Sequence, residues 1–173
     1  MTEKDNFFKK IEESGKEKNA KIENVKSDIS IFQNSMLTLA GDIKRWFQGT
    51  DVVVETIIYP LQDDSILRIF PEGEDLRTYD ITCLKIQHDN KIFIIMPLCI
   101  YAERDFISKE VIKGQALLIE IPKGPTRFML CSNGQGVWKI RSDRAPITMH
   151  DSLVHPLEPF TEEKFFEVLQ QFV

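Results

Sequence analysis

The strongest pattern along the chain is a helical repeat of apolar residues near the N-terminus. From Phe8 to Trp46 they recur at alternating steps of three and four, the spacing of a heptad seam. All but two of its positions, Gly15 and Lys18, are apolar. The seam consists of Phe8, Ile11, Gly15, Lys18, Ile22, Val25, Ile29, Phe32, Met36, Leu39, Ile43 and Trp46.

A capping signal divides this helical region. Ser14 and Glu17 have the spacing of a capping box, which predicts a short helix ending near residue 14 and a long helix over residues 15–47. The long helix would run about 50 Å, whereas a domain of the remaining residues would be about 30–35 Å across. We therefore expect the second half of the seam to pack on the domain and the first half to project or to meet another chain.

After Gly49 the period changes from helical to extended. Runs rich in Val, Ile and Phe recur between turn-forming residues, which is typical of strands. The expected strands cover residues 52–59, 66–70, 79–87, 91–96, 111–121, 127–131 and 136–141. Their short connections favour antiparallel pairing. The run 92–96 is apolar at every position, which predicts a central strand covered on both faces, and we expect Trp138 to share its core with Phe93 and Ile95.

The C-terminus carries a second helical signal. Thr161 is a suitable N-cap, and Glu162 and Glu163 suit a first helical turn. The stretch 144–159 contains three prolines and is expected to be irregular. The sequence thus predicts an α+β fold: a long N-terminal helical arm (1–49), then a mostly antiparallel sheet of six to seven strands with a C-terminal helix packed on it (50–173).

Composition narrows the class of protein. The 173 residues are 42% hydrophobic and 28% charged, which is typical of a globular domain. No apolar run approaches the roughly 18 residues that span a bilayer, and the first residues are charged rather than signal-like, so we expect no membrane association and a cytoplasmic location. Cys83, Cys99 and Cys131 form no disulfide framework, and buried free thiols are expected.

The charge is unevenly distributed. The net charge is −5, which disfavours binding to nucleic acid. Residues 51–90 hold nine acids and three bases, and several of these acids lie in or beside turns, where binding residues concentrate. A basic protein partner would fit such loops. The candidate partner-binding residues, expected at exposed loop tips, are Asp63, Asp64, Glu72, Glu74 and Asp75.

No arrangement of residues predicts a catalytic, metal-binding or cofactor-binding site. His150 and His155 lack the spacing of a helical metal pair, and His88 lies in an expected turn. The loop 71–75 lacks the alternating ligands of a calcium site. The eight glycines form no phosphate-binding loop.

These observations favour a non-catalytic cytosolic protein-binding module that forms homo-oligomers through its N-terminal helix. One form of such a module is a cognate inhibitor of a basic partner, as an immunity protein or an antitoxin would be. A secretion-type chaperone is a second form. A small enzyme of undefined reaction, with its site at the sheet edge or under residues 144–159, is the alternative class.

Overall fold

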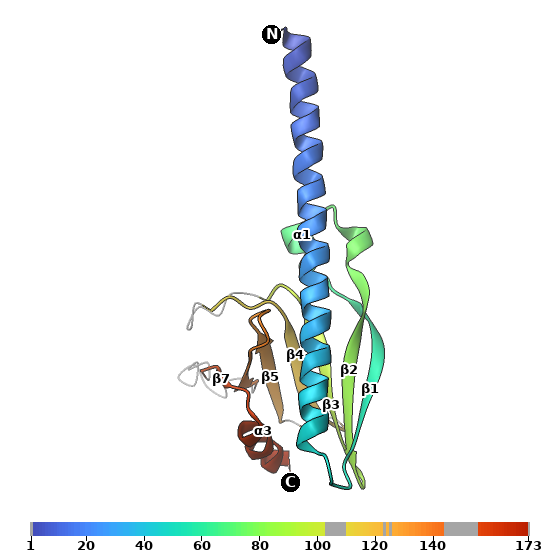
Figure 1. The fold of residues 1–173 in the computed structure, drawn as a ribbon, viewed down its shortest axis with the longest axis vertical. Coiled ribbons are helices and arrows are strands. Elements are labelled where there is room, and N and C mark those ends of the chain that lie inside the picture. The colour runs from blue at the N-terminus through green and yellow to red at the C-terminus, as the bar shows by residue number, and fades with distance from the viewer. Residues whose placement is uncertain (1, 103–109, 123, 125, 144–155, 173) are drawn as a thin grey trace.

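The computed structural model describes residues 2–102, 110–122, 124, 126–143 and 156–172. It has the predicted α+β architecture: a long N-terminal helix, a seven-stranded antiparallel sheet and a C-terminal helix. Helix α1 crosses one face of the sheet, and its first half extends well beyond the strands (Figure 1). The expected irregular stretch lies largely outside the described residues, as do His150 and His155.

Helix α1 is one uninterrupted element, Glu3–Trp46, of 44 residues and about 66 Å. The expected break near Ser14 is therefore wrong. The cap that the chain uses is Thr2, whose hydroxyl accepts a hydrogen bond from the amide of Asp5 while the Asp5 carboxylate accepts one from the Thr2 amide. Because the cap lies twelve residues earlier, helix propagation runs through Ser14 and Gly15 at only the modest cost of an interior glycine.

The sheet is a simple meander in which each strand pairs with its neighbours in sequence order. Its β2–β3 connection is the predicted tight turn, with Asp89 at a φ of 51°, and Asn133 and Gly134 begin the turn between β5 and β6. The strands are β1 (Val53–Gln62), β2 (Thr78–His88), β3 (Lys91–Cys99), β4 (Gln115–Ile121), β5 (Arg127–Ser132), β6 (Trp138–Ser142) and β7 (Glu158–Pro159).

One expected strand, residues 66–70, is instead helical. Helix α2 spans Ser65–Ile69, and a 3₁₀ turn, Glu74–Leu76, follows it. Ile66 and Phe70 are buried, whereas Arg68 between them is exposed. In a strand all three would lie on one face, so this burial pattern has the period of a helix. A short apolar run does not distinguish the two structures by itself, and this one packs beneath the middle of α1 as part of the core.

The main core lies between the sheet and one layer of helices. The second half of the seam on α1, from Val25 to Ile43, is buried against the strands. Helix α3 (Glu162–Leu169), capped by Thr161 as predicted, packs beside the end of α1, where the Trp46 and Phe165 rings are 5.6 Å apart. Trp138 lies in this core with Phe93 and Ile95, as expected.

Strand β3 is covered more fully on one face than on the other. Phe93 and Ile95 are buried under the helices, whereas Ile92, Ile94 and Met96 on the opposite face are only half-buried. The expectation that both faces of this strand are covered is therefore confirmed only for the face under the helices. Cys83 and Cys131 are buried free thiols, as predicted, and Cys99 is half-buried.

Candidate functional site

A fully buried carboxylate lies where β1 ends. Asp63 is 0% exposed, and its two oxygens accept four hydrogen bonds. Oδ1 accepts from the amide of Ser65 at 3.0 Å and from the Ser65 hydroxyl. Oδ2 accepts from the Tyr79 hydroxyl and from the Ile100 amide, both at 2.8 Å. The expectation that Asp63 lies exposed at a loop tip is therefore wrong, and a partner protein has no access to it.

A second layer of polar contacts joins this carboxylate to α1. The Tyr101 amide donates to the Ser65 hydroxyl at 3.1 Å, and the Tyr101 hydroxyl donates to Asp28 at 2.7 Å. Lys113 forms an ion pair with Asp28 at 3.5 Å. This chain of contacts connects the long helix to the start of α2 and to the segments that follow β3 and precede β4. We call this chain of contacts the structural tie, and each donor named in it has an acceptor.

Tyr79 and Cys99, two ionisable groups beside the structural tie, favour their neutral forms. Burial, reinforced by the Asp63 charge, raises the pKa of Tyr79 far above its ordinary value. The same two causes raise the pKa of the Cys99 thiol to about 12. A thiol of that pKa is protonated at neutral pH, so Cys99 is not an activated nucleophile.

The other acidic residues predicted to face a partner are exposed, but they are partly neutralised. Arg77 forms ion pairs with both Asp64 and Glu74 at 2.7 Å. Glu72 pairs with Lys18 of α1 at 3.2 Å, and Asp75 is exposed on the same 3₁₀ turn as Glu74. The structure thus gathers Asp64 and Glu74 around a single arginine and turns Glu72 toward the helix.

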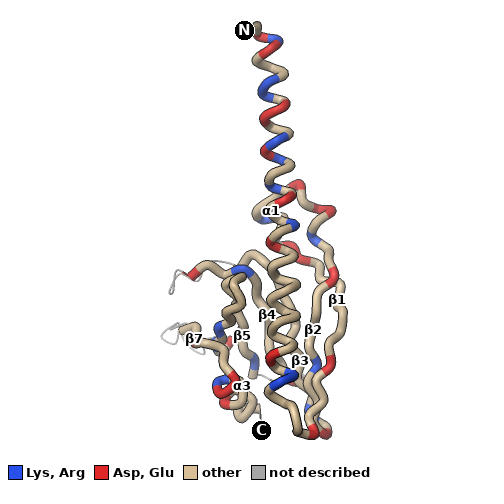
Figure 2. Tube along the Cα trace, viewed as in Figure 1, with Lys and Arg blue, Asp and Glu red and all other residues tan. Residues whose placement is uncertain are grey.

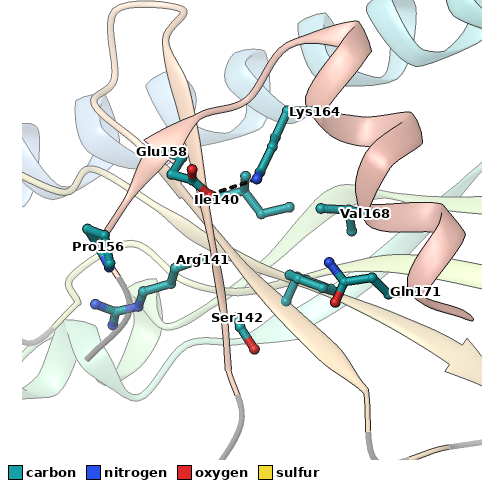
Figure 3. Close-up of a pocket in the computed structure, with 9 residues that line it drawn as sticks. Ile140, Arg141, Ser142, Pro156, Glu158, Lys164, Val168 and Gln171 are labelled. Carbon is teal, nitrogen blue, oxygen red and sulfur yellow. Dashed lines mark ion pairs between the residues drawn. The ribbon is translucent and has the colours of Figure 1, made fainter. Parts of the chain in front are cut away.

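A polar pocket of about 390 Å³ lies between β5, β6 and α3 (Figure 3). The Lys164 ammonium reaches Glu158 at 2.8 Å and Glu167 at 3.1 Å, and hydrogen bonds to these carboxylates raise the pKa of the lysine. The Arg141 guanidinium extends away from Lys164. Lys164 is therefore held as a cation in an ion pair rather than prepared as a base or a nucleophile.

The described residues contain no candidate for a metal centre or a membrane span. Within the described ranges, no three His, Cys, Asp or Glu side chains gather as metal ligands. Of the helices that the structure describes, none combines the length and apolarity needed to cross a bilayer.

The first half of α1 projects from the domain, which is one of the two arrangements expected from the sequence. Residues 3–21, here called the helical arm, are exposed except for a half-buried Asn6. Phe7, Phe8 and Ile11 near the tip are each more than half exposed, and the two phenyl rings meet edge to face at 5.7 Å. Basic and acidic residues alternate along the rest of the arm (Figure 2). The arm is thus an amphipathic helix with an apolar tip that its own sheet does not cover.

Comparison with known proteins finds no matching family model, no similar curated protein and no similar solved structure, so function has to be inferred from this geometry.

Proposed function

We propose that this protein is a non-catalytic protein-binding module and that a partner polypeptide binds its helical arm. The observation that carries the proposal is the apolar tip of the arm, where Phe7, Phe8 and Ile11 face solvent on a helix that extends beyond the sheet (Figure 1). Large apolar side chains gathered on a projecting element are a feature of interaction sites.

The arm is built to bind with little loss of conformational freedom. A free helix of this length is marginal in water. Here the helix continues into the half of α1 that is fixed on the sheet from Val25 onward, and Lys18 is tied to Glu72 at its base. Ion pairs between residues four apart, such as Lys16 with Glu12 at 2.6 Å, add a small local stabilisation. A partner groove would therefore receive a preformed helix.

The arm offers a short seam, which bears on the kind of partner. From Val25 onward the heptad seam is used by the protein's own sheet. Ile22 also packs against that core, and Gly15 and Lys18 are not apolar, which leaves Phe8 and Ile11. Since stable self-paired helices use three to four heptads, these positions favour an apolar groove on a different protein over a second arm. Homo-oligomers that form through the arm are the alternative arrangement, and the light-scattering measurement described below would detect them.

The acidic loops supply a weaker candidate surface. Inhibition of a basic partner, in the manner of an immunity protein or an antitoxin, would use Asp64, Glu72, Glu74 and Asp75. Lys18 and Arg77 already neutralise part of this charge, which reduces its attraction for a cation. A secretion-type chaperone would also present an apolar docking element, and the arm suits that form as well.

The test replaces the apolar tip while keeping the helix. A variant carrying Phe7→Gln, Phe8→Gln and Ile11→Gln retains good helix formers at all three positions. The matched control is Leu37→Gln, an apolar residue that is 55% exposed on the docked half of the same helix. Tagged parent, arm variant and control are used to retain proteins from native lysate, and the retained protein is then purified and titrated against all three chains.

The proposal expects a stoichiometric partner that binds the parent and the control and whose affinity for the arm variant falls by roughly tenfold or more, as for loss of interface anchors. A partner that binds the arm variant and the parent equally would contradict it. So would a parent chain that retains no stoichiometric partner and shows no arm-dependent change in mass by light scattering.

A further inference from the structure

The first strand of the sheet has an unpaired edge of unusual length. Strand β1, Val53–Gln62, pairs with β2 along all ten residues, and on its other side the described chain places no strand. Figure 1 shows β1 at the margin of the sheet with no helix beyond it. At about 3.4 Å per residue the edge is roughly 34 Å long. A row of backbone amides and carbonyls of this length is a template for pairing with another strand.

The side chains on this edge strand are apolar on both faces of the sheet. Ile58 is 66% exposed, and Val53, Ile57 and Tyr59 are also exposed. Ile57 and Tyr59 lie on one face and Ile58 on the other, because side chains alternate along a strand. Glu55 is the only charged residue in the strand, and Lys85 of β2 pairs with it at 3.4 Å.

The opposite edge of the same sheet is protected in the usual way. Strand β7 is only two residues long, Glu158–Pro159, and both residues are exposed. One of them is a charge and the other lacks an amide hydrogen, which are features that discourage edge pairing. Strand β1 also contains one charge and one proline, Glu55 and Pro60, but on this much longer edge they leave the run Thr56–Tyr59 without either feature.

We propose that β1 pairs in antiparallel fashion with β1 of a second copy of this chain, joining the two seven-stranded sheets into one. A two-fold axis perpendicular to the sheet relates the copies. The helix-covered face of one sheet therefore continues into the helix-covered face of the other. With the axis at Ile57 or at Ile58, that isoleucine meets its own symmetry mate, and Val54 meets Pro60 or Gln62.

The charge pattern of the strand suits a second copy. In the two registers, Glu55 lies opposite Tyr59 or Leu61 and never opposite another acid. Like charges directly across from one another would weaken the pair, and here none meet. In the register centred on Ile58, Ile57 also lies opposite Tyr59, so pairing brings apolar residues of the two copies together on both faces.

The symmetry also separates this surface from the helical arm. The axis keeps both α1 helices on the same face of the joined sheet and reverses their directions, so the two arms extend from opposite ends of the dimer. The arms do not meet within such a dimer and remain open to another protein. Pairing through β1 and binding through the arm can therefore succeed or fail independently.

The experiment measures mass by light scattering over a range of concentrations up to hundreds of micromolar. We expect twice the chain mass of 20.1 kDa for the parent and for the arm variant defined above. Ile57→Lys and Ile58→Lys place an edge-protecting charge at exposed positions, and we expect each to raise the dissociation constant of the dimer by roughly tenfold or more. Leu37→Lys, the same change at a comparably exposed residue away from the edge, should leave the mass unchanged.

Cross-linking gives a second measurement that does not depend on a destabilising substitution. Ile57→Cys or Ile58→Cys, whichever residue lies on the axis, should form a disulfide between copies, whereas Leu37→Cys should not. The native thiols should stay unreacted, because Cys83 and Cys131 are buried and the half-buried Cys99, like Cys83, has a raised pKa. A parent that is monomeric at every concentration, or a dimer that survives both lysine variants and yields no cross-link at either position, overturns the proposal.

Discussion

The Tyr79 hydroxyl donates a 2.8 Å hydrogen bond to Oδ2 of Asp63, so the first residue after β1 is joined to the second residue of β2 inside the protein. The same oxygen accepts the amide of Ile100 from the chain that follows β3. One carboxylate thus fixes the ends of three strands relative to one another. The loop 63–77 that Asp63 begins carries α2 and packs under α1, so the contact also sets how the helix lies on the sheet.

Replacing Asp63 with asparagine should destabilise the fold although the shape hardly changes. All four contacts to the carboxylate come from donors. Rotated hydroxyls could accept from the new amide, but in either orientation its NH₂ would face a backbone N–H, that of Ser65 or of Ile100. A buried donor left unpaired costs about 1–3 kcal/mol, and we expect Asp63→Asn to lower the free energy of unfolding by that amount in urea.

The neighbouring residue supplies the control for this change. Asp64→Asn removes the same charge from an exposed side chain whose ion pair with Arg77 is at the surface. Surface ion pairs contribute at most about 1 kcal/mol, so this variant should unfold close to the parent. Equal losses at the two positions would show that net charge, rather than the buried contacts, is responsible.

Stability should fall in alkaline solution because of groups near the same carboxylate. Burial and the Asp63 charge hold the pKa of Cys99 at about 12 in the folded protein against 9.0 for an ordinary thiol, and they raise the pKa of Tyr79 above 10.0. Above pH 9 the unfolded chain therefore releases protons that the folded chain keeps. The unfolded state then binds fewer protons, and the free energy of unfolding decreases as pH rises.

Urea midpoints measured from neutral pH to about pH 11 should show this decline. Tyr79→Phe removes one titrating group, so it should make the decline shallower even though it lowers stability at neutral pH. A decline of the same steepness in Tyr79→Phe and in the parent would exclude this tyrosine as its source.

The regular elements were predictable because their patterns repeat. The seam of α1 continues over many turns, and alternating apolar strands between Asn, Gly and Asp turns define the meander. Ser14 misled the prediction because a capping motif matters only where the helix begins, and Thr2 with Asp5 begins it first. Residues 66–70 misled it because five residues are too few to separate the two periods.

The location of Asp63 was not predictable from composition. An acid beside another acid and a serine resembles a solvated turn, and the turn does exist, since the Ser65 amide donates to Asp63. Its burial follows from partners far away in sequence, Tyr79 and Ile100, which only the register of β1 with β2 and the path after β3 bring together. The exposed arm, in contrast, followed from comparing the length of a helix with the width of a domain.

Substitutions of Trp138 should show how much a large buried ring contributes to the stability of the core. Its side chain is 6% exposed, and its indole N–H has no hydrogen-bond partner among the described groups. Trp138→Ala should cost about 3–5 kcal/mol, as loss of a large buried ring does. Trp138→Phe leaves a smaller void and removes the unpaired N–H, so its cost should be well under half as large. Urea unfolding followed by circular dichroism measures both, and equal costs would show that the packing of a ring at this position does not set the loss.

Gly114 should be the least replaceable glycine of the chain. It adopts a φ of +149°, and an added Cβ would lie 2.3 Å from Cδ2 of Phe32, a ring of α1 that is completely buried. Gly114→Ala should therefore cost about 2–4 kcal/mol through backbone strain and overpacking. Gly41→Ala is the control, because a Cβ added at this helical glycine would meet nothing within 4 Å, and the variant should gain about 0.5–1 kcal/mol from helix propensity.

A double-mutant cycle separates the two costs at Gly114. Phe32→Leu removes the ring that the new methyl group would meet, while the backbone angle stays the same. If the clash dominates, Gly114→Ala with Phe32→Leu should be less destabilised than the sum of the two single variants by about 1 kcal/mol or more. Additive losses would assign the cost to the backbone alone and would show that β4 and α1 can move apart at this contact.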